Sequence, residues 1–127
     1  PMPKLLLPTL SYVLPVFALA FLLGALRVTL VAPRIGPLAA VALELPLVLA
    51  LSWAIAGQVL ARWPLAPRLG MGLTSFLMLM LLELTTALAF GQTPGQFLAA
   101  MVTPPGALGL AGQIGFGLIP LVRQPKG

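Results

Sequence analysis

Residues 5–30 read LLLPTLSYVLPVFALAFLLGALRVTL, and in this stretch only Arg27 carries a charge. An α-helix crosses the hydrocarbon core of a bilayer with about 20 predominantly apolar residues. The stretch is long enough for that, and it is followed by the turn-forming sequence PRIGP at residues 33–37. It therefore predicts a first membrane-spanning helix over about residues 5–30.

The composition of the whole chain agrees with a membrane location. Of its 127 residues, 60% are hydrophobic and 7% are charged, and the mean hydropathy is +1.10. Soluble domains carry about 25% charged residues, so this composition indicates an integral membrane protein. A chain of this length supplies about four spans joined by short loops, and we expect no soluble domain.

Three further apolar stretches lie between groups of turn-forming residues, over about residues 38–61, 69–90 and 105–122. Between the last two, the chain reads TPGQFLAAMV at residues 93–102. Its Thr can cap a helix and its Pro can occupy the first helical position, so we expect a short helix here, at the membrane interface. The predicted fold is all-α: a single domain over residues 1–127, built as a bundle of four transmembrane helices with a short interfacial helix before the last span.

Three charged residues interrupt the predicted spans, one on each of the first three: Arg27, Glu44 and Glu83. Counted along an α-helix, each lies about 10 Å from the same end of its span. Ionisable groups inside a bilayer are costly unless they face the protein interior and find partners. We therefore expect one cation and two carboxylates to meet in a buried polar cluster.

Three interpretations of this cluster are open. In the first, Arg27 forms a structural ion pair with both carboxylates, because its guanidinium offers several donors in a fork geometry. In the second, one Glu carries an exchangeable proton or binds a cation, because two carboxylates share a single Arg. In the third, Arg27 extends to the lipid headgroups and no cluster forms.

Small residues mark two further helix faces. Gly24 lies on the same face of the first span as Arg27 and leaves space for a neighbouring helix. In the last span, Ala107, Ala111 and Gly115 follow one another at intervals of four residues. Such a stripe lets two transmembrane helices approach closely, so these small residues are predicted to mediate helix packing.

Most of the remaining positive charges lie near the ends of the predicted spans. Trp63, together with Arg62 and Arg68, is typical of anchors at a membrane interface. The side that holds both termini carries most of the Lys and Arg residues, so both termini are predicted to be cytoplasmic, in the bacterial inner membrane. The net charge of +5 then indicates contact with anionic lipids and not with nucleic acid.

The chain contains no Cys, no His and no Asp. It therefore lacks the usual ligands of zinc, haem and iron–sulfur clusters, and the thiol and imidazole groups of many active sites. We expect no cofactor and no metal. An enzyme is disfavoured because the Ser and Tyr hydroxyls have no His or Asp to act as a base.

Three short sequences carry a resemblance to known proteins: GALRV at residues 24–28, APRIG at 32–36 and LELP at 43–46, with a Glu in the third span. Together they resemble a family of short, uncharacterised bacterial membrane proteins, over about residues 17–90. In that family an acidic residue precedes the last span, where this chain has VTP at residues 102–104. The resemblance implies four spans with a shared Arg–Glu core and supplies no activity.

Two functions are compatible with these features. The chain is predicted to be a non-catalytic accessory subunit of a larger bacterial membrane protein complex, such as a respiratory or photosynthetic energy-converting complex. Its partners would be larger membrane protein subunits and lipids, with no soluble substrate. Alternatively, it is a small transporter or channel in which Glu44 and Glu83 move protons or cations. One copy of four helices is too thin to enclose a solute path, so this alternative requires oligomers.

Overall fold

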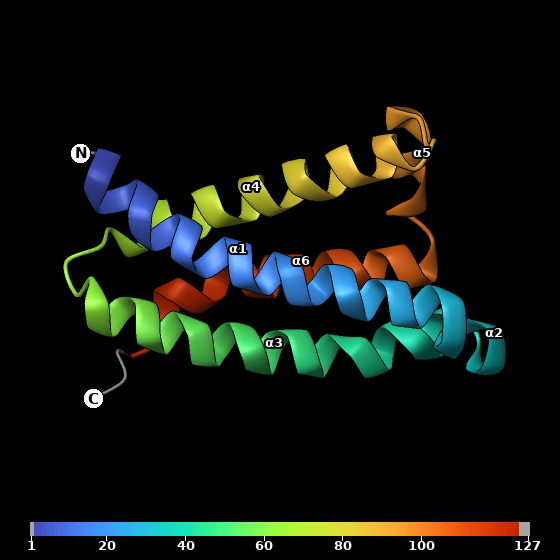
Figure 1. The fold of residues 1–127 in the computed structure, drawn as a ribbon, viewed down its shortest axis with the longest axis horizontal. Coiled ribbons are helices and arrows are strands. Elements are labelled where there is room, and N and C mark those ends of the chain that lie inside the picture. Colours follow the sequence, from blue (N-terminus) through green and yellow to red (C-terminus); the bar gives the residue numbers. More distant parts are fainter. Residues whose placement is uncertain (1, 125–127) are drawn as a thin grey trace.

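The computed structural model describes residues 2–124, in which all regular secondary structure is helical (Figure 1). One turn of π-helix, η1, joins α1 to α2 without a break, so these three elements form one continuous helix. The elements in chain order are α1 (Met2–Leu26), η1 (Arg27–Val31), α2 (Ala32–Ile35), α3 (Pro37–Arg62), α4 (Arg68–Ala89), α5 (Pro94–Ala100) and α6 (Pro104–Val122).

Within the described residues, four helices are long and apolar enough to cross a membrane: residues 4–35, 37–62, 68–89 and 104–122. The prediction of an all-α protein with four helices that could cross a membrane is confirmed. A short helix also precedes the last of the four, where the sequence predicts one. Thr93 is its N-cap and Pro94 its first residue, and a capping box joins the Thr93 and Gln96 side chains to each other's backbone N–H groups.

The first helix is longer than predicted, because it continues past residue 30 to Ile35 and ends at Gly36, whose φ is 92°. In η1 the hydrogen bonds reach back five residues, as from the Ala32 N–H to the Arg27 carbonyl oxygen. Pro33 follows directly after η1 in this continuous helix, and because it has no N–H to donate to the preceding turn, a local π-helical turn is one way to accommodate it. The helix over residues 4–35 has 32 residues and is about 48 Å long, which exceeds the hydrocarbon thickness of about 30 Å.

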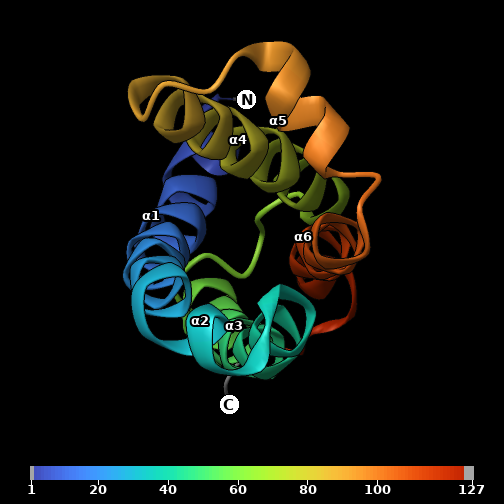
Figure 2. The same cartoon turned by 90° about the vertical axis from the view of Figure 1, so that its right-hand side faces the viewer.

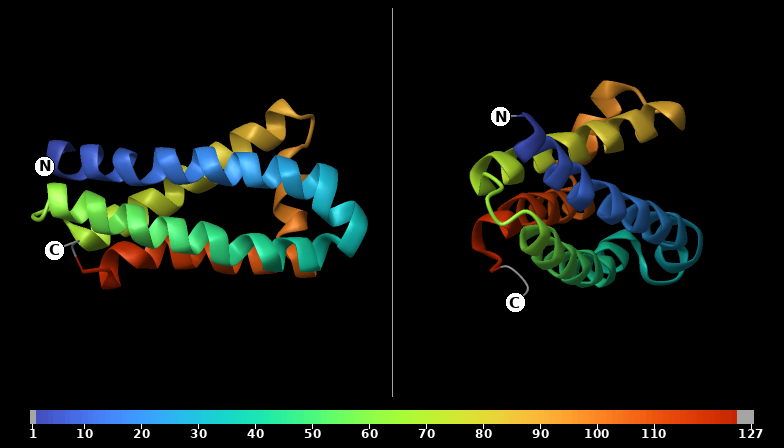
Figure 3. Two further views of the ribbon diagram at one scale, coloured as in Figure 1. Left: turned by 60° about the horizontal axis from the view of Figure 1, so that its bottom comes forward. Right: turned by 60° about the vertical axis from the view of Figure 1, so that its left-hand side comes forward.

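Each long helix packs against two others: α4 against α6, α6 against α3, and α1 against both α3 and α4. The start of α1, the connection from α3 to α4 and the end of α6 lie at one end of the molecule, which we call the terminal end (Figure 1). The opposite end holds α2 and α5, and Figure 2 looks along the helices from there. Toward this α5 end, α4 diverges from α1 (Figures 1 and 3).

The buried core lies nearer the terminal end. In α1 the buried residues stop at Val16 and in α4 at Leu79, whereas in α6 they begin at Gly112. Toward the α5 end these three helices therefore bury fewer of their side chains, whereas α3 has two buried residues near that end, Ala40 and Val41. The core consists of Tyr12, Val13 and Val16 from α1, Ala56, Val59 and Leu60 from α3, Ala66 from the connection to α4, Met71 and Leu79 from α4, and Phe116 and Ile119 from α6.

A hydrogen bond between α1 and α6 lies in this core. The Tyr12 hydroxyl donates to the Phe116 carbonyl oxygen at 2.5 Å, and the two rings are stacked with centroids 4.4 Å apart. Inside a helix this carbonyl would normally accept from the residue four positions later, but that residue is Pro120, which has no N–H. Tyr12 therefore donates to an oxygen that its own helix leaves free, which is how membrane helices tolerate proline.

This arrangement makes a double substitution informative. Tyr12→Phe keeps the stacked ring but leaves the Phe116 carbonyl without a donor, so we expect the free energy of unfolding in detergent to fall by about 1–2 kcal/mol. In a Pro120→Ala background residue 120 has an N–H for the same oxygen, and the loss caused by Tyr12→Phe should shrink to well under half. Equal losses in the two backgrounds would show that this hydrogen bond does not stabilise the fold.

The closest approaches between helices occur at glycines other than those predicted. A Cβ atom at Gly72 of α4 would collide with the carbonyl oxygen of Gly117 in α6, and one at Gly117 would lie 3.0 Å from the Phe76 Cβ. A Cβ at Gly112 would collide with the side chain of Leu45 from α3. Glycine at these positions lets α6 contact both α3 and α4 closely.

Two of the three residues that were predicted to pack in α6 do not pack against another helix of this chain. Ala107 and Ala111 are exposed, whereas at Gly115 a Cβ would lie 3.4 Å from Leu49 of α3. Small residues occur on several faces of α6, so the sequence does not reveal which face turns inward. The inward face was decided by the crossing at Gly117 and by the Leu45 side chain that fits against Gly112.

Candidate functional site

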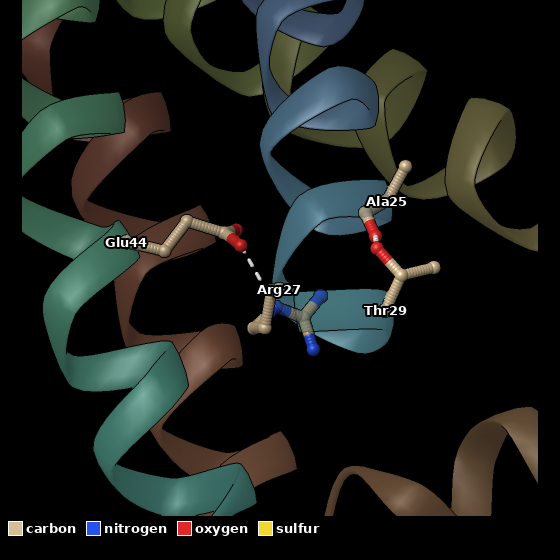
Figure 4. A network of polar contacts seen from close by, with 4 residues as sticks. All are labelled: Ala25, Arg27, Thr29 and Glu44. Carbon is tan, nitrogen blue, oxygen red and sulfur yellow. Dashed lines mark hydrogen bonds and ion pairs between the residues drawn. The ribbon is translucent and has the colours of Figure 1, made fainter. Parts of the chain in front are cut away.

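The structure brings Arg27 and Glu44 together as an ion pair. The Arg27 Nε donates to the Glu44 Oε1 at 2.8 Å, which connects the start of η1 to α3 (Figure 4). The two side chains are 31% and 19% exposed, so neither is fully buried in this chain. In Figure 4 the terminal nitrogens of Arg27 point away from Glu44. Arg27 is thus engaged with a second helix, in contrast to the interpretation in which it extends to the headgroups.

Glu83 finds a different partner. The Gln113 Nε2 donates to the Glu83 Oε1, which connects α4 to α6. Gln113 is a residue that the sequence reasoning missed. Its signal is an amide side chain in the middle of a span that otherwise holds apolar residues and glycine. In a bilayer such a group is expected to hydrogen-bond to a polar residue on another helix.

The polar residues therefore form two separate contacts, one between α1/η1 and α3 and the other between α4 and α6. Among the described residues Arg27 makes its salt bridge with Glu44 and not with Glu83, so the predicted contact of one Arg with both carboxylates is not formed. The physical reason is which helices are neighbours. At this level α4 lies against α6, and its orientation turns Glu83 toward Gln113. Arg27 and Glu44 are still near enough to Glu83 for their charges to act on it.

The local backbone helps to place Arg27. It is the first residue of η1, and a π-helical turn rotates the side chains that follow relative to an unbroken α-helix. Gly24, one turn earlier, lies beside the guanidinium, because a Cβ there would be 3.5 Å from the Arg27 NH2. At that distance a Cβ would make an ordinary contact, so the Arg27 side chain does not require a glycine here, and among the described residues no neighbouring helix comes within 4 Å of this position.

The polar side chains of this region offer charge and hydrogen bonding. In the part of the chain that the structure describes, no three His, Cys, Asp or Glu side chains come together as a metal site would need. The two carboxylates and the Arg add up to a formal charge of −1 when all are ionised (+1 − 1 − 1). Such a group can hold a proton or attract a cation, or it can remain a structural pair beside a neutralised Glu.

The terminal end gathers positive charge without a nearby acidic residue. Arg62 lies 5.1 Å from the centre of the Trp63 ring, and the Arg68 NH1 donates to the Arg123 carbonyl oxygen at 3.0 Å. Lys4 is exposed at the same end. The chain's acidic residues number two, Glu44 and Glu83, and both lie at least 15 residues along α3 and α4 from the connection between these helices. Lys126, which contributes to the predicted charge asymmetry, lies outside the described residues.

Arg123 connects the end of α6 to α3. Its Nε donates to the Trp53 carbonyl oxygen at 3.0 Å, and its guanidinium lies 5.0 Å from the centre of the Trp53 ring. It also packs on Gly57, where a Cβ would lie 2.7 Å from the Arg123 Cζ. The absence of a side chain at Gly57 is therefore what lets the guanidinium reach the backbone of α3.

No protein-family model, no curated protein and no solved structure matches this chain. The resemblance to short bacterial membrane proteins, based on residues 24–28, 32–36 and 43–46, stays a prediction. Its implied Arg–Glu core corresponds in position to the Arg27–Glu44 pair.

Proposed function

We propose that this chain is a non-catalytic accessory subunit of a larger bacterial membrane protein complex. It would lie in the inner membrane as a four-helix bundle with both termini in the cytoplasm and α5 at the opposite interface. The observation that carries the proposal is the loose packing toward the α5 end. There the Arg27–Glu44 pair lies within the membrane-crossing helices but remains 31% and 19% exposed.

Partly exposed charges in a membrane span are costly when they face lipid. A neighbouring subunit that covers them would remove that cost and would complete the packing that α4 and α1 lose as they diverge. The exposed small residues Ala107 and Ala111 on α6 also offer a surface on which a partner helix can approach closely. An energy-converting complex, respiratory or photosynthetic, is the kind of host that we favour.

Extraction in mild detergent followed by native electrophoresis tests this proposal. We expect the chain to migrate with an assembly much larger than itself. Ala111→Phe should release it from the assembly without changing its own unfolding temperature, because the side chain at 111 is exposed. A matched control is Leu43→Phe on the exposed face of α3. A solitary monomer in fresh extracts would contradict the accessory role.

The alternative of a small oligomeric transporter or channel is favoured by one observation. Glu83 is paired with an uncharged amide and not with Arg27, so its negative charge has no cation in contact among the described residues. If this Glu carries protons, Glu83→Gln should abolish proton flux in liposomes and leave the fold intact, since Gln can keep a hydrogen bond to Gln113. Flux that is absent in the unsubstituted protein, or unchanged in the variant, would exclude this alternative.

A further inference from the structure

An apolar groove runs along the outer surface between α4 and α6, and one end of it meets the cationic terminal end. The groove has a volume of about 270 Å³, and its floor is the crossing of Gly72 and Gly117. Its walls are apolar side chains from both helices, and several of them are more than half exposed. They are Leu69, Leu73, Phe76, Ile114, Leu118 and Leu121.

The groove exists because of the two glycines. Where α4 and α6 touch through Gly72 and Gly117, no side chain covers the contact, while the leucines on either side project outward. From Leu69 to Phe76 the groove extends by about 10 Å along the helix axis, whereas the hydrocarbon layer of one bilayer leaflet is about 15 Å thick. Its shape and its lining therefore fit part of a lipid acyl chain.

The open end of the groove is positively charged. Leu69 follows Arg68 in the sequence, and Leu121 lies two residues before Arg123. The Arg68 NH1 donates to the Arg123 carbonyl oxygen, so the guanidinium of Arg68 lies across the ends of the two helices that form the groove. Among the described residues this is the one hydrogen bond that the Arg68 side chain makes, and it forms no salt bridge.

We propose that this groove binds an anionic glycerophospholipid, with one acyl chain along Gly72 and Gly117 and the headgroup phosphate at Arg68. Charge complementarity selects this occupant over an apolar helix of a partner protein. Arg68 brings a positive charge to the mouth, and an apolar helix has nothing to neutralise it. A guanidinium with free N–H groups binds phosphate oxygens well, in fork geometry. The site is independent of the accessory role proposed above.

The site can be tested by native mass spectrometry of the full chain in detergent, with phosphatidylglycerol and phosphatidylcholine of identical acyl chains as probes. We expect phosphatidylglycerol to be retained in preference to phosphatidylcholine. Arg68→Gln should weaken its binding by about fivefold, which corresponds to one cation at a membrane surface. Arg62→Gln removes the same charge from the same end away from the groove, and it should have less than half this effect.

Further measurements distinguish the contribution of the groove to lipid binding from that of the phosphate contact. Leu118→Trp fills the groove and should weaken phosphatidylglycerol binding, whereas Leu43→Trp, on an exposed face of α3, should not. Glycerol phosphate, which has no acyl chain, should bind far more weakly than the whole lipid. Arg68→Lys keeps the charge and should retain most of the binding, and unfolding temperatures measured without lipid show whether each variant is folded.

Four results would overturn the proposal. The first is equal retention of the two lipids, and the second is an equal loss in Arg68→Gln and Arg62→Gln. The third is capture of a protein, and not of a lipid, by a photoreactive group at position 73, which would assign the groove to a partner helix. Binding of glycerol phosphate as tight as that of phosphatidylglycerol would likewise exclude the acyl chain from the site.

Discussion

Arg27→Leu is expected to lower the free energy of unfolding by about 2–3 kcal/mol, because it leaves the Glu44 carboxylate in the membrane without its cation. Removing one partner of a fully buried pair costs about 3–5 kcal/mol. The loss here should be smaller, since the two side chains are 31% and 19% exposed. Equilibrium unfolding in mixed detergent measures it.

Replacing the acidic member of the pair, as in Glu44→Leu, should cost less stability. With all groups ionised, Arg27→Leu changes the formal charge of the three-residue group from −1 to −2, whereas Glu44→Leu changes it from −1 to 0 (+1 − 1). In Glu44→Leu the freed guanidinium can turn toward Glu83, whose charge it already acts on, or toward the headgroups. We therefore expect the loss for Glu44→Leu to be about half of that for Arg27→Leu.

The double variant Arg27→Leu/Glu44→Leu tests whether the ion pair itself stabilises the fold. Replacing both members of a buried pair with apolar residues is often neutral, so most of the stability lost in Arg27→Leu should return. If the two single losses simply add in the double variant, the ion pair makes no contribution and the structural interpretation of this site is wrong. If all three variants are as stable as the unsubstituted chain, the pair has a role other than stability.

Gly72→Ala is the second substitution from which we expect a large effect. One methyl group at this position would collide with the Gly117 backbone carbonyl, which cannot rotate away as a side chain would. Helices α4 and α6 must then separate, and the loss should be about 3 kcal/mol, at the upper end of the cost of overpacking. Thermal unfolding and the yield of monodisperse protein measure it.

Gly109→Ala is the matched control, because a Cβ at this position of α6 would meet nothing within 4 Å. Ala is a better helix former than Gly by about 1 kcal/mol, so this variant should be unchanged or slightly more stable. A Gly72→Ala variant as stable as Gly109→Ala would show that α4 and α6 are farther apart than in the structure. Because Gly72 also forms the floor of the groove, its substitution is not a test of lipid binding.

The number and place of the long helices follow from the sequence. Each depends on a long, predominantly apolar run of residues, and a membrane forces such a run to satisfy its own backbone hydrogen bonds as a helix. The predicted spans over residues 38–61, 69–90 and 105–122 differ from the observed helices by one residue at each end, or less. The capping of α5 by Thr93 was also predictable, because it depends on neighbouring residues alone.

Which polar groups meet depended on the tertiary structure. The sequence places Arg27, Glu44 and Glu83 at similar depths but contains no information on the rotation of each helix about its axis. The crossing of α4 and α6 at Gly72 and Gly117 fixes that rotation and turns Glu83 toward Gln113.

The same limit applies to the helix surfaces. Small residues occur around α6, and the sequence favoured the face of Ala107 and Ala111, which is exposed in the structure. The bond between Tyr12 and the Phe116 carbonyl likewise needed the arrangement of the four helices that brings these two residues of α1 and α6 together, although Pro120 identifies the oxygen that lacks a donor. Hydropathy and capping are properties of a local segment and determine the helices. Rotation and pairing depend on contacts between different helices, from 17 residues apart for Arg27 and Glu44 to 104 for Tyr12 and Phe116, and only the folded chain decides them.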